Sequence, residues 1–296
     1  MEITNRFRLP KVVVEALTKD TYTKGDSVRS ITTLIDSPQI RILQEEHDAD
    51  ITQDVTDFLW SRFGTAMHEM FEKAASDLTS DKEGQGISEE RLYVEKHNWK
   101  VSGAIDLQQV SSDGVIISDY KVTSVWSVIF DKKEWHSQLN AYAWLVRHAK
   151  HLPVKQLRII AILRDWSRRK AEESRDYPSS PITIINIPMW SEAEQDIYMN
   201  SRITLHQSAE FDRLTSDDPL PQCSPKERWQ KETTYAAMKK KRVRAIKLFD
   251  SMEDAEKHVE NLGKDHYVQT REGINTRCEQ DWCRVNQWCE QFKNSN

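Results

Sequence analysis

The chain has 296 residues, of which 30% are charged, and a formal net charge of −5. This length can bury one large or two modest hydrophobic cores, and 8 glycines with 9 prolines are too few for a disordered or fibrous composition. There is no run of about 18 apolar residues that could span a membrane. The first residues, MEITNRFRLPKVVVEAL, lack the long apolar stretch of a signal peptide. We therefore expect a cytoplasmic protein with no membrane partner.

The negative net charge does not by itself indicate a nucleic-acid binder, but basic residues cluster in two segments. Six of the ten residues of 238–247 and four of the seven residues of 164–170 are Lys or Arg. A solvated basic face is one explanation for each cluster, and DNA phosphate contact is the other. The candidate DNA-binding residues are Arg164, Arg168, Arg169, Lys239, Lys240, Lys241 and Arg242.

The first half of the chain predicts one long helix followed by strands. Apolar residues recur at three- and four-residue spacing over 48–76, which predicts a helix, and Gly64 inside it indicates a break or a close packing contact. Residues 81–88 predict a loop. Three strands are predicted to follow, over 91–100, 101–110 and 115–122.

The second half alternates helices and strands before its composition changes. A helix is predicted over 133–150, strands over 157–163 and 181–188, and a helix from the Ser191/Glu194 capping box to about Phe211. Interleaved strands and helices favour an α/β fold with a mixed sheet flanked by helices. Residues 215–225 are rich in Pro, Ser and Asp and predict a boundary. We expect a core over 1–215 and a basic, cysteine-rich extension over 216–296.

Residues 103–124, GAIDLQQVSSDGVIISDYKVTS, predict a β-hairpin with an Asp-Gly turn signal. If Asp113 and Gly114 form the loop, Asp106 pairs with Lys121. If the loop is one residue earlier, Asp106 lies opposite Asp119. Both registers put the two aspartates and the lysine on one face, because side chains alternate along a strand.

Two facing carboxylates destabilise a hairpin unless something neutralises them. Oxygen ligands of this kind suit Mg²⁺ or Mn²⁺, and Lys121 can then stabilise a phosphate or orient an attacking water. A solvated face whose charges pair with one another is the alternative. Two predicted helices add polar i, i+4 pairs, His68 with Glu72 and Gln138 with Tyr142.

In chain order these residues form four motifs: Gly64-x-x-x-His68, Gly103-x-x-Asp106, Asp119-x-Lys121 and Gln138-x-x-x-Tyr142. This order resembles the RecB-like branch of the PD-(D/E)XK nuclease superfamily over about residues 30–163. The resemblance implies a restriction-endonuclease-like core. It also implies that the metal is surrounded by His68, Asp106, Asp119 and the carbonyl of Tyr120, and that the catalytic residues are Asp106, Asp119, Lys121, Gln138 and Tyr142. Glu72 is expected either to support His68 or to bind the metal.

The resemblance implies a metal-dependent DNA exonuclease of the stand-alone kind found in bacteriophages and bacteria. Such proteins process DNA ends for recombination, replication or repair, so a recombinase, a single-strand-binding protein or a helicase is an expected partner besides DNA. A structure-specific or restriction-type endonuclease is a competing hypothesis. A DNA-end-binding module without catalysis is another, and the intact Asp106, Asp119 and Lys121 argue against it.

The four cysteines are Cys223, Cys278, Cys283 and Cys289, and the last three have the spacing C-x4-C-x5-C. This differs from the paired C-x2-C knuckles of structural zinc sites. RecB-like relatives often hold a [4Fe–4S] cluster with one cysteine before the core and three after it. Here Ser37 stands where such relatives read Cys-Pro, which leaves Cys223 as the fourth ligand. A zinc site and unligated buried thiols are the alternatives.

Tryptophans flank two of these motifs, Trp126 and Trp135 around Asp-x-Lys, and Trp282 and Trp288 among the cysteines. We expect core packing for most of them, with stacking against unpaired bases as the alternative.

Overall fold

The fold is that of a computed structural model, which describes residues 1–19, 25–78, 86–130, 132–216 and 218–295. Its contacts divide the chain into two compact units. The first unit comprises residues 1–38 and 49–218, and the second comprises residues 39–48 and 219–296. The described part of the chain contains no helix that is long and apolar enough to cross a membrane.

The elements up to residue 218 follow in chain order, and all of them belong to the first unit except α3, of which residues 39–46 belong to the second. They are β1 (Glu2–Thr4), α1 (Lys11–Thr18), β2 (Arg29–Ser30), α2 (Ile31–Leu34), α3 (Pro38–Glu46), β3 (Thr52–Asp54), α4 (Leu59–Leu78), β4 (Gly86–Lys96), β5 (Trp99–Ser111), β6 (Gly114–Thr123), α5 (Trp126–Ile129), α6 (Lys133–Lys150), β7 (Val154–Leu163), α7 (Arg168–Glu173), β8 (Ile182–Ile187) and α8 (Glu192–Thr215). Short 3-10 helices cover Asp48–Asp50 and Val55–Phe58.

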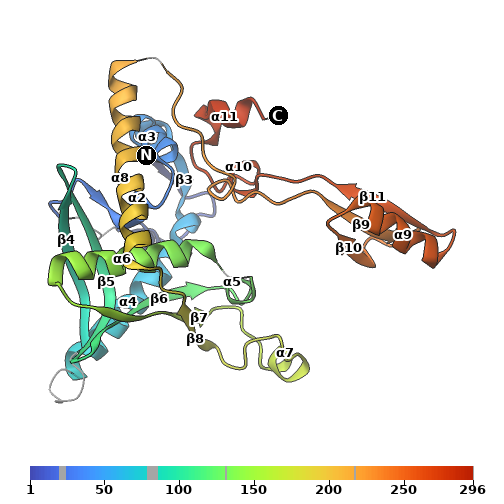
Figure 1. The fold of residues 1–296 in the computed structure, drawn as a ribbon. Helices are drawn as coiled ribbons and strands as arrows, with labels where there is room; N and C mark the ends of the chain where they lie inside the picture. The colour runs from blue at the N-terminus through green and yellow to red at the C-terminus, as the bar shows by residue number, and fades with distance from the viewer. Residues whose placement is uncertain (20–24, 79–85, 131, 217, 296) are drawn as a thin grey trace. The chain divides into compact units, whose positions relative to one another are not determined.

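A six-stranded mixed sheet is the centre of the first unit (Figure 1). The strand order is β2-β5-β6-β7-β8, and β4 also pairs with β5. β5 is antiparallel to β4 and β6, while β6 and β7 are parallel. The expected α/β fold with a mixed sheet flanked by helices is confirmed.

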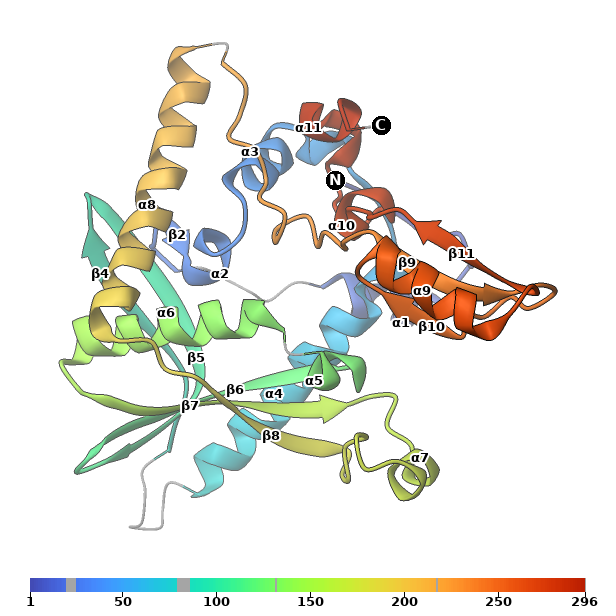
Figure 2. The same cartoon turned by 45° about the vertical axis from the view of Figure 1, so that its right-hand side comes forward.

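Helices α4 and α6 pack on opposite faces of this sheet, and Figure 2 shows both beside it. The side chain of Tyr120 on β6 faces α4, where its ring lies 4.5 Å from that of Phe71. Asp119, one residue earlier, faces α6 and accepts a hydrogen bond from Gln138. Neighbouring residues of one strand therefore reach the two helices, as the alternation of side chains requires.

The helix predicted over 48–76 begins later than expected, at Leu59. Asp54 caps the 3-10 helix that precedes it and forms a capping box with Asp57. The three residues Thr52–Asp54 pair in parallel with β1, near the start of the chain. This long-range pairing and the cap override the local periodicity, while Gly64 lies inside an unbroken α4.

β7 begins at Val154, three residues before the predicted start, because Val154 pairs in parallel with Val115 of β6. A hairpin explains the differences in β4 and β5. β4 and β5 join at His97 and Asn98, which both have positive φ angles, of 50° and 60°. The predicted boundary at residue 100 is therefore wrong. Part of the loop predicted over 81–88 lies outside the described residues, and its last three residues belong to β4. Helix α6 has the predicted bounds, and α8 continues four residues past Phe211.

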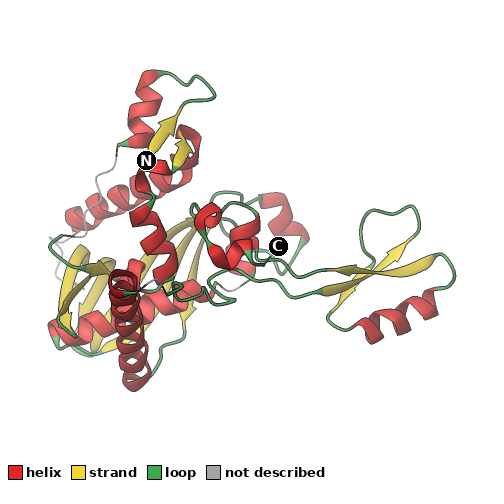
Figure 3. Cartoon of the chain, turned by 90° about the horizontal axis from the view of Figure 1, so that it is seen from above, coloured by secondary structure: helices red, strands yellow, loops and turns green. Residues whose placement is uncertain are grey.

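The second unit contains β9 (Thr234–Lys239), β10 (Lys247–Phe249), α9 (Met252–Leu262), β11 (His266–Arg271), α10 (Thr276–Glu279), a 3-10 helix over Asn286–Trp288 and α11 (Glu290–Lys293). Its three strands form an antiparallel sheet in the order β10-β9-β11. Helix α9 packs against this sheet (Figure 3). Its His258 lies 5.1 Å from the ring of Phe249 on β10. The C-terminal turns and residues of α3, among them Gln39, Ile40 and Leu43, line the cavity that the cysteines share.

Candidate active site

The two hairpin aspartates stand where the strands that carry them separate. β5 and β6 pair from Ser111↔Gly114 to Leu107↔Ser118, so the loop is Ser112-Asp113. This is the register that sets Asp106 opposite Asp119. Beyond the last pair, the backbone N–H of Tyr120 donates to Oδ2 of Asp106 at 2.7 Å. The aspartate side chain thus takes the place of a backbone acceptor in the ladder.

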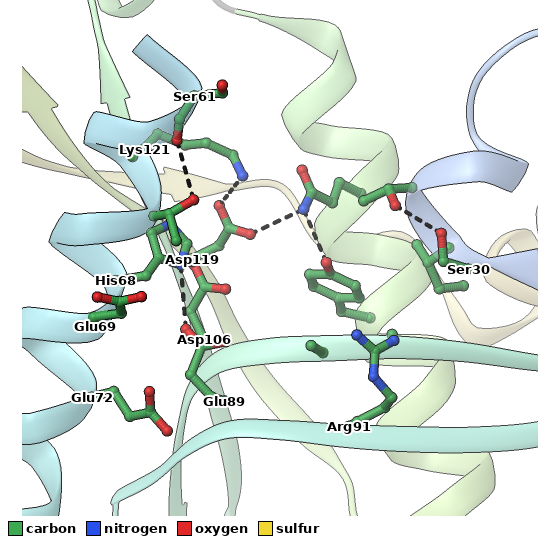
Figure 4. Close-up of a pocket in the computed structure, with 18 of the residues that line it drawn as sticks. Ser30, Ser61, His68, Glu69, Glu72, Glu89, Arg91, Asp106, Asp119 and Lys121 are labelled. Atoms are coloured by element: carbon green, nitrogen blue, oxygen red, sulfur yellow. Dashed lines mark hydrogen bonds and ion pairs between the residues drawn. The ribbon is translucent and has the colours of Figure 1, made fainter. Parts of the chain in front are cut away.

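Asp119, Lys121, Gln138 and Tyr142 form one connected chain of polar contacts (Figure 4). Lys121 Nζ lies 2.6 Å from Oδ2 of Asp119. Gln138 Nε2 donates to Oδ1 of Asp119 and to the hydroxyl of Tyr142, each at 3.0 Å. Both oxygens of the buried Asp119 carboxylate are therefore held, one by β6 and one by α6.

Gly103 is required by the close approach of α6 to β5. A Cβ atom at this position would lie 2.9 Å from Cε1 of Tyr142 and 2.7 Å from Cδ1 of Leu145. Any larger side chain would displace Tyr142, which holds Gln138. The glycine of the Gly-x-x-Asp motif thus supports the Gln-x-x-x-Tyr motif.

His68, Glu89 and Asp106 are the group of side chains that could hold a metal ion, among the residues described. One donor atom from each lies within 4.8 Å of the others. His68 Nδ1 is 3.3 Å from Oε1 of Glu89 and 3.6 Å from Oδ2 of Asp106, and its Nε2 is 3.2 Å from the carbonyl oxygen of Tyr120. Asp119 does not belong to this group, because its carboxylate contacts Lys121 and Gln138 instead.

Glu89 was missed in the sequence, where it falls near the predicted loop. Its φ angle is +51°, and the β4–β5 ladder pairs Ser88 with Leu107 and Glu90 with Ile105 but skips Glu89. The left-handed backbone aims its carboxylate at His68. The signal that could have revealed it is the turn at His97-Asn98, because counting back from this turn sets Glu89 opposite Asp106.

The electrostatics of the site reflect crowded carboxylates. Burial and the charge of Asp119 raise the pKa of Asp106 to about 8, against the opposing effects of His68, Lys121 and the Tyr120 N–H. Burial disfavours the charged form of His68. The hydrogen bond with Glu89 and the charges of Asp106, Glu89 and Asp119 outweigh it and raise the pKa of His68. A divalent cation would counter the causes that raise the pKa of Asp106, so this donor set fits Mg²⁺ or Mn²⁺.

These residues line an open cleft of about 590 Å³. The cleft is also lined by Arg62 on α4 and Arg91 on β4, two cations that the motifs did not reveal. Glu72 lines it too, without belonging to the group of three donors. Gly64 lines it without a close packing contact, because a Cβ atom there would meet no heavy atom within 4 Å.

The four cysteines lie together in the second unit. All four are buried, none is in a disulfide, and all line one small cavity. Gln39 on α3 reaches the same cavity, with Oε1 3.2 Å from Sγ of Cys223 and 3.6 Å from Sγ of Cys289. Ser37, two residues earlier, does not line it.

The predicted DNA-binding residues are divided between the units. Arg164 follows β7 and places its guanidinium 4.4 Å from the centre of the Trp60 ring. Arg168 and Arg169 begin the exposed α7, where Arg169 pairs with Glu173. In the second unit, Lys239 ends β9 and the basic residues after it are exposed in the turn to β10.

The tryptophans fall into two classes. Trp135 is 6% exposed and belongs to the core of the first unit, as expected. Trp288 stacks on His47 at 4.3 Å within the second unit. Trp126 and Trp282 are 56% and 64% exposed, so core packing does not account for either.

Comparison with known proteins gives one family. A model described as the PD-(D/E)XK nuclease superfamily matches residues 41–290, whereas no curated protein matches the chain. A solved structure named SSO0001 is 15% identical and covers 65% of this chain and 82% of its own, with a TM-score of 0.40. A candidate exonuclease from Eubacterium rectale is 14% identical, with 66% and 68% covered and a TM-score of 0.27. Because the matched family region spans most of the chain and contains every residue of the polar network around Asp106 and Asp119, the chain belongs to the PD-(D/E)XK nuclease superfamily.

Proposed function

We propose that this protein is a divalent-metal-dependent DNA exonuclease that processes DNA ends in recombination, replication or repair. The observation that carries the proposal is the meeting of Asp106, Asp119 and Lys121 in one open cleft, beside the His68–Glu89–Asp106 group. The cleft is open enough to admit a phosphodiester, and its residues supply both carboxylates and a cation.

We assign metal binding to His68, Glu89 and Asp106, and propose that the Tyr120 carbonyl and the Asp119 carboxylate, both on β6, would add to this donor set when an ion binds. An imidazole in the donor set shifts the preference from Mg²⁺ towards Mn²⁺. When bound, the ion supplies positive charge that favours ionisation of the attacking water and stabilises charge on the phosphate.

Lys121 acts on the reacting groups directly. Its charge is fixed by Asp119, whose negative charge opposes the effect of burial and raises the pKa of Lys121. A protonated amine cannot serve as a general base, so the Lys121 ammonium donates hydrogen bonds to the attacking water and to the phosphate oxygens. Gln138, held by Tyr142, fixes the Asp119 carboxylate that orients this amine.

End-labelled linear DNA and covalently closed circles, incubated with Mg²⁺ or Mn²⁺, test the exonuclease function. Linear DNA is expected to be shortened progressively, while closed duplex circles persist. Cutting of closed circles as fast as linear DNA, or discrete sequence-dependent fragments, would favour an endonuclease. Binding to DNA ends without any product under all metal conditions would favour a non-catalytic module.

We further propose that Cys223, Cys278, Cys283 and Cys289 bind a [4Fe–4S] cluster. The four thiols line one cavity, which supports a single shared centre. A tetrahedral zinc ion with bonds of about 2.3 Å would hold the sulfurs about 3.8 Å apart. Within the described residues, the cysteines form no group of three donors within 4.8 Å, and this wider spacing favours the larger cluster.

Metal analysis of anaerobically purified protein tests the cluster. Brown protein with iron and sulfide near four each per chain is expected for a Cys₄ [4Fe–4S] site. Colourless protein with stoichiometric zinc would replace the cluster by a structural zinc site. Absence of both iron and zinc would indicate that the cysteines are unligated thiols packed in the core.

A further inference from the structure

Two pairs of exposed aromatic side chains lie on the segments next to the cleft. Trp60 and Phe63 on α4 are 51% and 42% exposed, and Trp126 and Phe130 at α5 are 56% and 72% exposed. The first pair meets edge to face, with ring centres 6.3 Å apart. The second pair is stacked, at 5.8 Å and an interplanar angle of 16°. Aromatic rings that are this exposed leave apolar surface in contact with water, and clusters of such surface favour contact with a ligand.

Both pairs are attached to the same end of the sheet. The guanidinium of Arg164 lies over the Trp60 ring, and its backbone N–H donates to the carbonyl of Thr123, the last residue of β6. Thr123 also donates through its hydroxyl to Ser127 of α5 at 2.7 Å. Arg164 and Thr123 therefore connect the start of α4 to the end of β6 and to α5. Thr123 is two residues beyond Lys121.

The start of α4 belongs to the wall of the cleft. Ser61, Arg62, Gly64 and Thr65 line the cleft, whereas Trp60 and Phe63 come from the same turns of α4 but do not line it. The open space beside Gly64 leaves the helix backbone accessible at this wall. The first aromatic pair therefore lies on the helix that forms this wall of the cleft, at the end of the sheet that carries Lys121 and Asp119.

We propose that Trp60, Phe63, Trp126 and Phe130, with Arg164, form a stacking surface for the unpaired bases of a DNA strand whose phosphate enters the cleft. This proposal rests on the proposed nuclease function. Aromatic side chains stack on single-stranded bases of any sequence, whereas the base faces inside a duplex are already covered. Arg164 adds positive charge for the phosphates. The strand that reaches the cleft is therefore single-stranded, as an overhang, a frayed end or a free strand.

Binding of the Lys121→Ala protein in Mg²⁺ tests the surface without turnover. Fluorescence anisotropy compares a short oligothymidine with a blunt duplex of the same length. Trp60→Ala and Trp126→Ala are each expected to weaken single-strand binding about tenfold, with duplex binding little changed. Trp60→Phe and Trp126→Phe keep an aromatic face and are expected to bind nearly as the parent. Phe211→Ala, on the exposed side of α8 and outside the cleft lining, is the matched control.

Unchanged single-strand binding in both alanine variants would overturn the proposal, as would equal losses on single strand and duplex. Loss caused equally by Trp60→Phe and Trp60→Ala would indicate a structural role of the indole. The nuclease function is tested separately with the p-nitrophenyl ester of thymidine 5′-monophosphate, a small diester with no neighbouring base to stack. Failure of the otherwise unmodified protein to hydrolyse this ester and DNA would contradict the nuclease, whereas hydrolysis with unaffected binding would contradict the stacking surface alone.

Discussion

Asp106→Asn replaces a carboxyl group that is 6% exposed and faces Asp119 across the hairpin with an amide that cannot ionise. The amide has nearly the same shape, and its oxygen can still accept the hydrogen bond from the Tyr120 N–H. The substitution therefore separates the electrostatic cost of the site from its packing. We expect it to stabilise the metal-free protein and to abolish DNA cleavage.

The magnitude follows from the pKa of Asp106, which rises from 3.8 to about 8 through burial and the charge of Asp119. At about 1.36 kcal/mol per pKa unit, this corresponds to about 6 kcal/mol for the fully ionised group and about 4 kcal/mol at neutral pH. An unpaired amide N–H in the same place costs about 1–3 kcal/mol. The net stabilisation is then about 1–3 kcal/mol, which raises the melting temperature by about 2–4 °C per kcal/mol for a unit of this size.

The sign of the pH dependence is fixed by the direction of the shift. The folded chain holds the Asp106 proton more tightly than the unfolded chain, so the stability of the parent protein falls as the pH rises from about 4 to about 8. The advantage of Asp106→Asn is therefore absent near pH 4 and largest near pH 8.

Melting temperatures in EDTA, measured by circular dichroism across this pH range, test the expectation. Asp113→Asn is the control, because Lys155 and Ser111 lower the pKa of Asp113 to about 2 and its loss has the opposite sign. With Mg²⁺ added, the parent should gain more stability than Asp106→Asn. A melting temperature for Asp106→Asn at or below that of the parent near pH 8 in EDTA would refute the reasoning.

Four further outcomes are expected. Lys121→Ala and Asp119→Ala should each abolish DNA cleavage. Lys121→Ala should keep the Mg²⁺-dependent rise in melting temperature, because the lysine is not a metal ligand. Near-normal turnover of a folded Lys121→Ala protein would exclude the role assigned to Lys121. Glu89→Gln should weaken Mn²⁺ binding in calorimetric titrations more than Glu72→Gln, and equal effects would remove Glu89 from the ligands. Cys278→Ala should bleach the absorbance of the cluster and lower the melting temperature. Neutralising Lys239, Lys240, Lys241 and Arg242 should make the slope of log affinity against log salt shallower by about 0.7–0.9 per lost phosphate contact, and an unchanged slope would leave them as a solvated face.

The parts of the site that could be predicted depend on short-range geometry. The hairpin from Asp106 to Lys121 follows from strand alternation and a two-residue turn, whichever register is adopted. Helix α6 has the predicted bounds because its apolar periodicity is unbroken and His151 ends it in a left-handed conformation. The Ser191/Glu194 capping box likewise begins α8 where expected.

The parts that could not be predicted depend on contacts between distant segments. Residues 52–54 have a helical pattern, but pairing with β1 makes them a strand. Gln39 and Cys223 are 184 residues apart in sequence, so no local spacing indicates that they meet. The exposure of Trp126 also depends on what packs over α5, which the spacing of aromatic residues does not reveal.

The two unfavourable features of the active site fall on residues that face one another. A non-glycine residue with positive φ costs about 1–3 kcal/mol, and Glu89 keeps this conformation because ladder pairs on both sides of it hold β4 against β5. Asp106, on the facing strand, carries the raised pKa. Both belong to the group of donors within 4.8 Å of one another. The unfavourable free energy of bringing them together is therefore part of the folding of the sheet and not of metal binding. A cation that binds there needs little rearrangement of its ligands, and its charge opposes the repulsion that destabilises the metal-free protein. Strain and low stability at this point of the sheet are therefore expected to increase metal affinity.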